Sequence, residues 1–295
     1  AVEPIIYYLD PGTPEPVRSA LLDGARWWNQ AFEAAGYIDA FQVKMLPEDA
    51  DPLDVRYNVI QWVHRSPRGW SYGSSVGDPR TGEIIKGHVS LGSLRVRQDF
   101  LIAEGLLAPY ASDAIPEDMR DMALARIRQL SAHEVGHTLG LAHSYAASTA
   151  GRASVMDYPH PYVKLTDGKI DLSEAYDTKI GEWDKIAIRY GYTDLGTEDK
   201  PKLNEILLDA HDKGIRFISD RDARARGGAH AEAHLWDNGA SASEELERVL
   251  EVRQVALRNF SLNNIRDGEP SSNLEDRLVP IYLVHRYQPG AAGRV

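Results

Sequence analysis

One segment of eleven residues, from His133 to His143, constrains this chain more tightly than any other. Its sequence is H-E-V-G-H-T-L-G-L-A-H. A helix turns by about 100° per residue, so His133 and His137 project from one helix face and can bind one metal ion. Gly140 predicts the end of this helix, because glycine enters the left-handed cap conformation without steric cost, and the chain can then return His143 to the same ion. Three protein ligands leave one position open, which is typical of a catalytic rather than a structural zinc site.

Glu134 stands beside the histidine pair, where a carboxylate can accept a proton from a metal-activated water. For the H-E-x-x-H pattern alone, the alternative is an ordinary amphipathic helix with two surface histidines. The glycine and the third histidine at fixed offsets favour the metal site. The chain has no cysteine, which excludes disulfides and thiol catalysis and leaves histidine or carboxylate as zinc ligands. We therefore predict Zn²⁺ as the cofactor, held by His133, His137 and His143.

The longer pattern H-E-x-x-H-x-x-G-x-x-H resembles the signature of the metzincin zinc peptidases. Downstream, the segment S-V-M-D-Y at residues 154–158 resembles their Met-turn. The resemblance implies that Met156 has a structural role at the metal site, whereas Met156 taken alone would be a core methionine. It also implies that Tyr158 lies below the zinc as an extra ligand or as a stabiliser of the tetrahedral oxyanion. A packed tyrosine at the floor of the cleft is the alternative for Tyr158.

Four further segments are similar to the catalytic region of bacterial exported zinc-dependent metalloproteases that carry a C-terminal domain of unknown function. These segments are residues 27–36, 69–73, 234–239 and 284–287. The resemblance implies that the chain is part of a longer polypeptide and acts outside the cytoplasm, in the periplasm, in the cell envelope or as a secreted protein. The chain starts at Ala1 and no signal peptide opens it, so we expect a mature form or an excised fragment.

Apolar patterning predicts an α+β fold, with a metzincin-like catalytic domain over residues 1–193. Strands are expected over 3–9, 41–46 and 55–63, and a hairpin is expected from 70–76 and 83–91. Helices are expected from residue 13, over 94–107, and from near Pro116 through the metal motif. A second hairpin at 163–172 and a helix over 181–190 complete the domain. These elements predict a mixed twisted sheet backed by helices, with a small C-terminal subdomain after the metal-binding helix.

Residues 194–295 are predicted to form a mostly helical extension that packs on the catalytic domain. Ser241 with Glu244, and Ser272 with Glu275, have the spacing of helix capping boxes. Pro280 is expected to kink or shorten the second of these helices. The first helix carries an apolar stripe that should be buried, formed by Leu246, Val249, Leu250, Ala256, Leu257 and Phe260.

The formal net charge of −11 argues against a nucleic-acid partner, and no apolar run is long enough to cross a membrane. A peptide or protein substrate is expected, while the oligomeric state cannot be determined from the sequence. An extended peptide would pair with an exposed sheet edge, which we assign to residues 83–91. We predict a zinc metallopeptidase with Glu134 as general base and acid, assisted by Tyr158. The alternatives are a catalytically weak zinc-containing scaffold or a zinc hydrolase of a non-protein amide.

Two lesser patterns could also bind metal ions. His230 and His234 are four residues apart, but neighbouring glycines and the missing third ligand favour a loop or a helix start. Asp220 and Asp222 could join a calcium site, although aspartate-rich loops are usually only solvated. Neither pattern is assigned a function.

Overall fold

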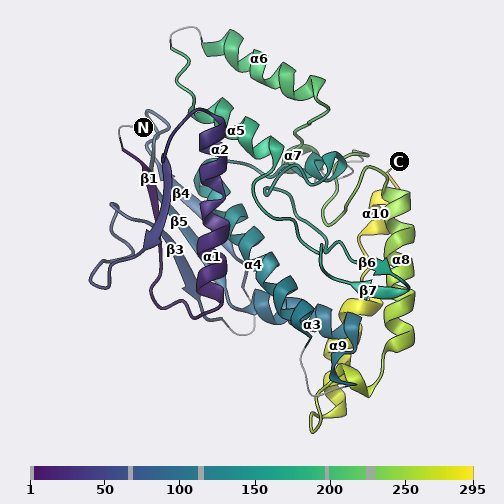
Figure 1. Ribbon diagram of the computed structural model, residues 1–295. Coiled ribbons are helices and arrows are strands. Elements are labelled where there is room, and N and C mark those ends of the chain that lie inside the picture. Colours follow the sequence, from purple (N-terminus) through teal and green to yellow (C-terminus); the bar gives the residue numbers. More distant parts are fainter. Residues whose placement is uncertain are drawn as a thin grey trace.

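The computed structural model describes residues 3–65, 69–111, 116–196, 199–223, 227 and 230–294 (Figure 1). Its strands are β1 (Ile5–Leu9), β2 (Phe41–Met45), β3 (Asn58–Val63), β4 (Tyr72–Gly77), β5 (Ile84–Gly92), β6 (Lys164–Thr166) and β7 (Lys169–Asp171). Its α-helices are α1 (Val17–Arg26), α2 (Trp28–Ala34), α3 (Leu94–Leu107), α4 (Glu117–Thr138), α5 (Glu182–Tyr192), α6 (Asp199–Asp212), α7 (Asp220–Ala223), α8 (Ala242–Asn259), α9 (Leu274–Tyr282) and α10 (Gln288–Ala292). Short 3₁₀-helices cover Pro109–Ala111, Tyr145–Ala150, Leu262–Asn264 and Ser271–Asn273.

The five-stranded sheet has the order β2-β1-β3-β5-β4 and is mixed. β1 runs parallel to β2 and β3, and β3 runs parallel to β5. β4 closes the sheet as an antiparallel partner of β5, which confirms the predicted hairpin and the α+β fold class. The assignment of the exposed edge to residues 83–91 is wrong, because β5 lies between β3 and β4, and the edge strands of the sheet are β4 and β2.

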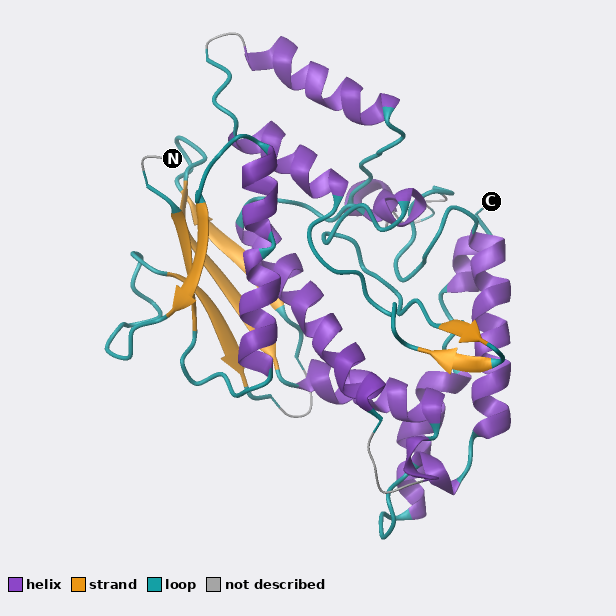
Figure 2. Cartoon of the chain, viewed as in Figure 1, coloured by secondary structure: helices purple, strands orange, loops and turns teal. Residues whose placement is uncertain are grey.

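Helices α1, α2 and α4 cover one face of this sheet (Figures 1 and 2). α4 is tied to α2 by the fully buried Trp28, whose Nε1 donates to the Ala132 carbonyl oxygen at 2.8 Å. It is tied to the sheet by a hydrogen bond of 2.7 Å between the hydroxyls of Tyr7 and Thr138. These two contacts lie at either end of residues 132–138, so this part of the metal motif is held against both the neighbouring helix and the sheet.

The metal-binding helix has the ends that the sequence predicts. α4 starts at Glu117, directly after Pro116, and ends at Thr138. Gly140 has a φ of +87°, a left-handed conformation that glycine adopts without strain, so the chain reverses there. The hairpin expected at 163–172 is formed by β6 and β7, and the helix expected over 181–190 is α5.

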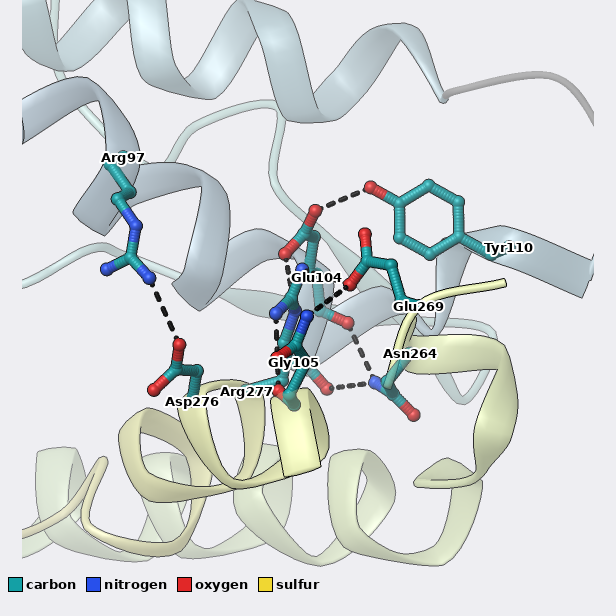
Figure 3. Close-up of polar contacts among 9 residues, drawn as sticks. Arg97, Glu104, Gly105, Tyr110, Asn264, Glu269, Asp276 and Arg277 are labelled. Carbon is teal, nitrogen blue, oxygen red and sulfur yellow. Dashed lines mark hydrogen bonds and ion pairs between the residues drawn. The ribbon is translucent and has the colours of Figure 1, made fainter. Parts of the chain in front are cut away.

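The segment after residue 193 is largely helical, as predicted, and a buried polar network joins it to α3 (Figure 3). Arg277 on α9 donates from Nε to Glu104 Oε2 at 2.8 Å, and from Nη2 to Glu269 Oε2 at 3.2 Å. Asn264 donates from its Nδ2 to the carbonyl oxygens of Glu104 at 2.7 Å and of Gly105 at 3.2 Å. These contacts hold the extension against the first half of the chain; the boundary at residues 193/194 stays a prediction.

The helices of this segment differ in detail from the predicted ones. Ser241 caps α8 by accepting a hydrogen bond from the Glu244 backbone nitrogen at 3.4 Å. The cap predicted at Ser272 is wrong, because a 3₁₀ turn occupies this position and α9 starts at Leu274. Pro280 lies inside α9, which ends shortly after it.

The apolar stripe of α8 is only partly buried. Val249 and Ala256 are buried, as predicted, but Leu250 is 41% exposed. Glu245 of the same helix is buried, and its carboxylate accepts hydrogen bonds from Arg248. Within the described ranges, no helix combines the length and apolar character that a membrane span requires.

Candidate metal centre

The three histidines of the motif converge on one point. Nε2 of His137 lies 3.2 Å from Nε2 of His133 and 3.2 Å from Nε2 of His143. All three potential ligand atoms lie within 4.8 Å of one another. α4 supplies the first two rings, and the reversal at Gly140 returns the third, as the spacing of the sequence predicts.

The other ring nitrogen, Nδ1, of each histidine faces an oxygen that can only accept a hydrogen bond. Each Nδ1 is therefore the protonated nitrogen, and each Nε2 carries a lone pair. The acceptors are the Val155 carbonyl at 2.8 Å from His133, the Leu141 carbonyl at 2.9 Å from His137, and Asp220 Oδ2 at 2.5 Å from His143. This tautomer is the one in which Nε2 binds a metal ion.

Two of the three spacings between these nitrogens fit zinc. Zinc–nitrogen bonds are about 2.0–2.1 Å long, so two nitrogens of a tetrahedral site lie about 3.3 Å apart, close to the observed 3.2 Å. Two such nitrogens without a hydrogen between them repel each other unless a cation lies near both. Protonation is no remedy for His133, because burial lowers the pKa of its imidazole well below the ordinary value. The donor set is therefore a group of three imidazole nitrogens suited to a divalent cation.

Met156 supports the floor of this site. It is fully buried, and its Sδ lies so close to α4 that a Cβ on Gly136 would approach it to 2.2 Å. The preceding residue, Val155, provides the carbonyl that orients His133. Asp184 holds this turn by accepting from the Val155 backbone nitrogen at 2.8 Å. Met156 thus packs against the metal-binding helix at Gly136, and its role as a Met-turn residue stays a prediction.

Glu134 is buried beside the histidines and lies against the start of β4. Burial raises the pKa of its carboxyl group to about 7, although the charge of Arg126 and a hydrogen bond from the Gly73 backbone nitrogen lower it. Gly73 belongs to the edge strand β4, and its missing side chain lets the strand backbone lie directly against Glu134. A carboxyl group with this pKa can exchange protons near neutral pH.

Tyr158 lies beside the same histidines in an aromatic cluster. Its ring centroid is 4.5 Å from that of His143 and 5.4 Å from that of His133. Trp236 stacks on Tyr158 at 5.8 Å, and Tyr287 stacks on Trp236 at 4.2 Å. Two segments quoted for the wider resemblance, 234–239 and 284–287, thus contribute the rings that support Tyr158.

Asp220 is the residue of the centre that sequence reasoning missed. Its carboxylate accepts from His143 Nδ1, although 77 residues separate the two in the chain. The sequence offered only the aspartate pair 220 and 222, interpreted as a possible calcium site or a solvated loop. In the described part of the chain, the three histidines form the only group of three or more metal-ligating side chains, and His230 and His234 do not join one.

A large apolar groove lies next to the centre, with a cavity volume of about 1030 Å³. Its lining includes Gly140, Leu141 and Ala142, which link His137 to His143, but none of the three histidines. Ile84 of β5 and Phe217 also line it. The groove therefore borders the loop that links His137 to His143, without contact to the three ligand side chains.

Comparison with known proteins identifies the family of the chain. A sequence profile described as Met-zincin matches residues 116–295, which is more than half of the chain. The chain belongs to the Met-zincin family. For this Met-zincin, no curated protein and no solved structure gives a significant match. Family and geometry agree, so His133, His137 and His143 form a zinc site.

Proposed function

We propose that this Met-zincin is a zinc-dependent peptidase that hydrolyses peptide bonds. The observation that carries the proposal is the convergence of three Nε2 atoms next to a buried carboxyl group, Glu134, which lies on the helix that bears His133 and His137. A purely structural zinc site is normally closed by four protein ligands and needs no adjacent carboxylate. Three ligands and a general base are the parts that hydrolysis requires.

Zinc, when bound, supplies Lewis-acid chemistry that acidifies water and polarises a carbonyl group. Glu134 accepts the proton of the attacking water, because its carboxyl group is buried next to the ligand His133 on the same helix. The same carboxyl group then donates this proton to the leaving amine nitrogen, so that one residue serves both steps. The hydrogen bond from Gly73 orients the Glu134 carboxylate during the exchange.

Tyr158 is proposed to donate its hydroxyl hydrogen toward the negative charge that develops on the scissile carbonyl oxygen. The support is its place against His133 and His143, fixed from behind by Trp236. Such a hydrogen-bond donor stabilises the transition state by roughly 2–4 kcal/mol.

The edge strand β4 is proposed to bind the substrate as an added strand. Its residues are mostly exposed, and β5 is its only partner in the described sheet. β4 also borders Glu134 through Gly73, so a peptide paired with this strand would pass in front of the centre. Pairing of main-chain groups gives affinity for extended peptides with little dependence on their sequence.

Cleavage of a diverse peptide library by the zinc-loaded protein, analysed by mass spectrometry, tests the proposal. Glu134→Gln should retain zinc and lose nearly all cleavage, because an amide cannot accept the proton of water. Glu117→Gln is the matched control, since Glu117 is an exposed carboxylate in the first turn of the same helix. No cleavage by the parent protein would favour a scaffold or a non-protein amide, and residual cleavage within about tenfold of the parent in Glu134→Gln would mean that another base acts.

A further inference from the structure

His143 differs from the other two zinc ligands in how it is held. His133 and His137 project from α4, and their Nδ1 atoms donate to main-chain carbonyls. His143 lies outside any helix or strand, after the reversal at Gly140. Its Nδ1 faces a carboxylate instead, Asp220 Oδ2 at 2.5 Å. The third ligand therefore has the least support from its own element and the only charged partner of the three.

Asp220 is itself held in place by contacts on both sides. Its second oxygen, Oδ1, accepts a hydrogen bond from the hydroxyl of Tyr145 at 2.9 Å. The Tyr145 backbone nitrogen donates to the carbonyl of Ile218 at 2.8 Å, which pins the chain just before α7. At the other end of α7, Ala223 is buried, and its carbonyl oxygen accepts from Arg294 Nη1 at 3.3 Å. The carboxylate thus reaches His143 from a short helix that is fixed at its start and at its end.

We infer that Asp220 is a positioning residue of the zinc centre and that the segment after residue 193 completes the support of the third ligand. A carboxylate that accepts from the Nδ1 of a ligating histidine fixes its tautomer and ring orientation and raises its basicity. The charge makes this hydrogen bond stronger than one to a carbonyl. The inference rests on the zinc site and does not depend on the proposed peptidase activity.

If Asp220 and His143 formed only an ordinary surface ion pair, loss of Asp220 would have little effect on zinc affinity. The neighbouring residue Asp222 distinguishes a positioning contact from such an ion pair. The Asp220 side chain is 46% exposed, whereas that of His143 is 14% exposed. Asp222 lies on the same short helix, is exposed and carries the same charge. Removal of either carboxylate changes the long-range field of the site in a similar way, but only removal of Asp220 breaks the hydrogen bond to His143.

The experiment measures zinc affinity by competition with a chromophoric chelator, for the full chain and for Asp220→Ala, Asp220→Asn and Asp222→Ala. Asp220→Ala should bind zinc about 10–100-fold more weakly than the parent. Asp220→Asn keeps an acceptor without the charge and should show a smaller loss. Asp222→Ala should remain close to the parent, and His143→Ala shows the loss that follows when the ligand itself is removed.

The visible absorption of the cobalt-substituted proteins gives a second readout, because it depends on the geometry of the ligands. It should change in Asp220→Ala and stay unchanged in Asp222→Ala. Parent-like zinc affinity in Asp220→Ala, or an equal loss in Asp222→Ala, would overturn the inference. If the metal-free Asp220→Ala variant fails to fold, as judged by its melting temperature, Asp220→Asn decides by the same criteria. A parent protein that binds zinc tightly but cleaves no peptide would refute the peptidase proposal and leave this inference intact.

Discussion

Replacement of Gly136 by alanine has two opposite effects on stability, one from helix propensity and one from tertiary packing. Gly136 lies inside α4, where replacement of glycine by alanine normally stabilises a helix by about 1 kcal/mol. A Cβ at this position, however, would lie 2.2 Å from Met156 Sδ and 2.6 Å from Trp28 Cζ2. Both neighbours are fully buried. We therefore predict that Gly136→Ala destabilises the protein.

The expected loss of unfolding free energy depends on how far Trp28 and Met156 can move away from the added Cβ. The indole of Trp28 is held by its hydrogen bond to Ala132, so it cannot turn away without losing that bond. Met156 would have to retreat by roughly 1 Å, and overpacking of this kind costs about 1–3 kcal/mol. Because two buried side chains clash at once, we expect a net decrease of about 2 kcal/mol in the free energy of unfolding after the propensity gain is included. Zinc affinity should also fall, since Val155, which precedes Met156, orients His133.

Urea-induced unfolding of the metal-free protein measures this decrease, and Gly191→Ala is the matched control. Gly191 lies in α5 and is exposed, and a Cβ there would meet nothing within 4 Å. Gly191→Ala should leave the free energy of unfolding unchanged or raise it by about 0.5–1 kcal/mol. A Gly136→Ala variant as stable as the parent would refute the packing argument and show that the helix can move away from Met156.

Three further predictions concern the extension, the pH response and the cleft. Arg277→Ala should lower the free energy of unfolding by about 3–5 kcal/mol in urea titrations, because it leaves Glu104 buried without its cation; a loss below about 1 kcal/mol would mean that this pair does not hold the extension. Burial lowers the pKa of His160 to about 4, so the unfolded chain takes up a proton at this residue below pH 6.5 while the folded protein does not, and His160 contributes a pH slope that lowers stability by up to about 3 kcal/mol between pH 6.5 and 4. His160→Gln should flatten this slope in pH-dependent unfolding of the metal-free protein, and an unchanged slope would contradict the assignment. Tyr158→Phe should lower kcat roughly ten- to a thousandfold with little change in KM or zinc content, whereas an unchanged kcat would make Tyr158 a packing residue.

The zinc ligands were predictable because their geometry is local. Residues four apart share a helix face, and a glycine after the helix reverses the chain, so H-E-x-x-H-x-x-G-x-x-H specifies three convergent nitrogens without any knowledge of the fold. The sheet elements were also found from their patterns, but not their order. The hairpin pattern pairs 70–76 with 83–91, but it does not show which of the two strands lies at the edge, because that depends on the pairing of β5 with β3.

Alone, the sequence determined the metal, its three ligands, the adjacent carboxyl group of Glu134 and the α+β class. The ligands and Glu134 depend on residue chemistry and on spacings of at most ten residues, and the α+β class depends on local apolar periodicity. Only the tertiary structure decided which carboxylate supports His143, which strand is exposed at the sheet edge, and how Trp236 and Tyr287 hold Tyr158. These contacts join residues separated by tens of positions, and periodicity carries no information about such pairs because they form only when the packed layers bring distant segments together.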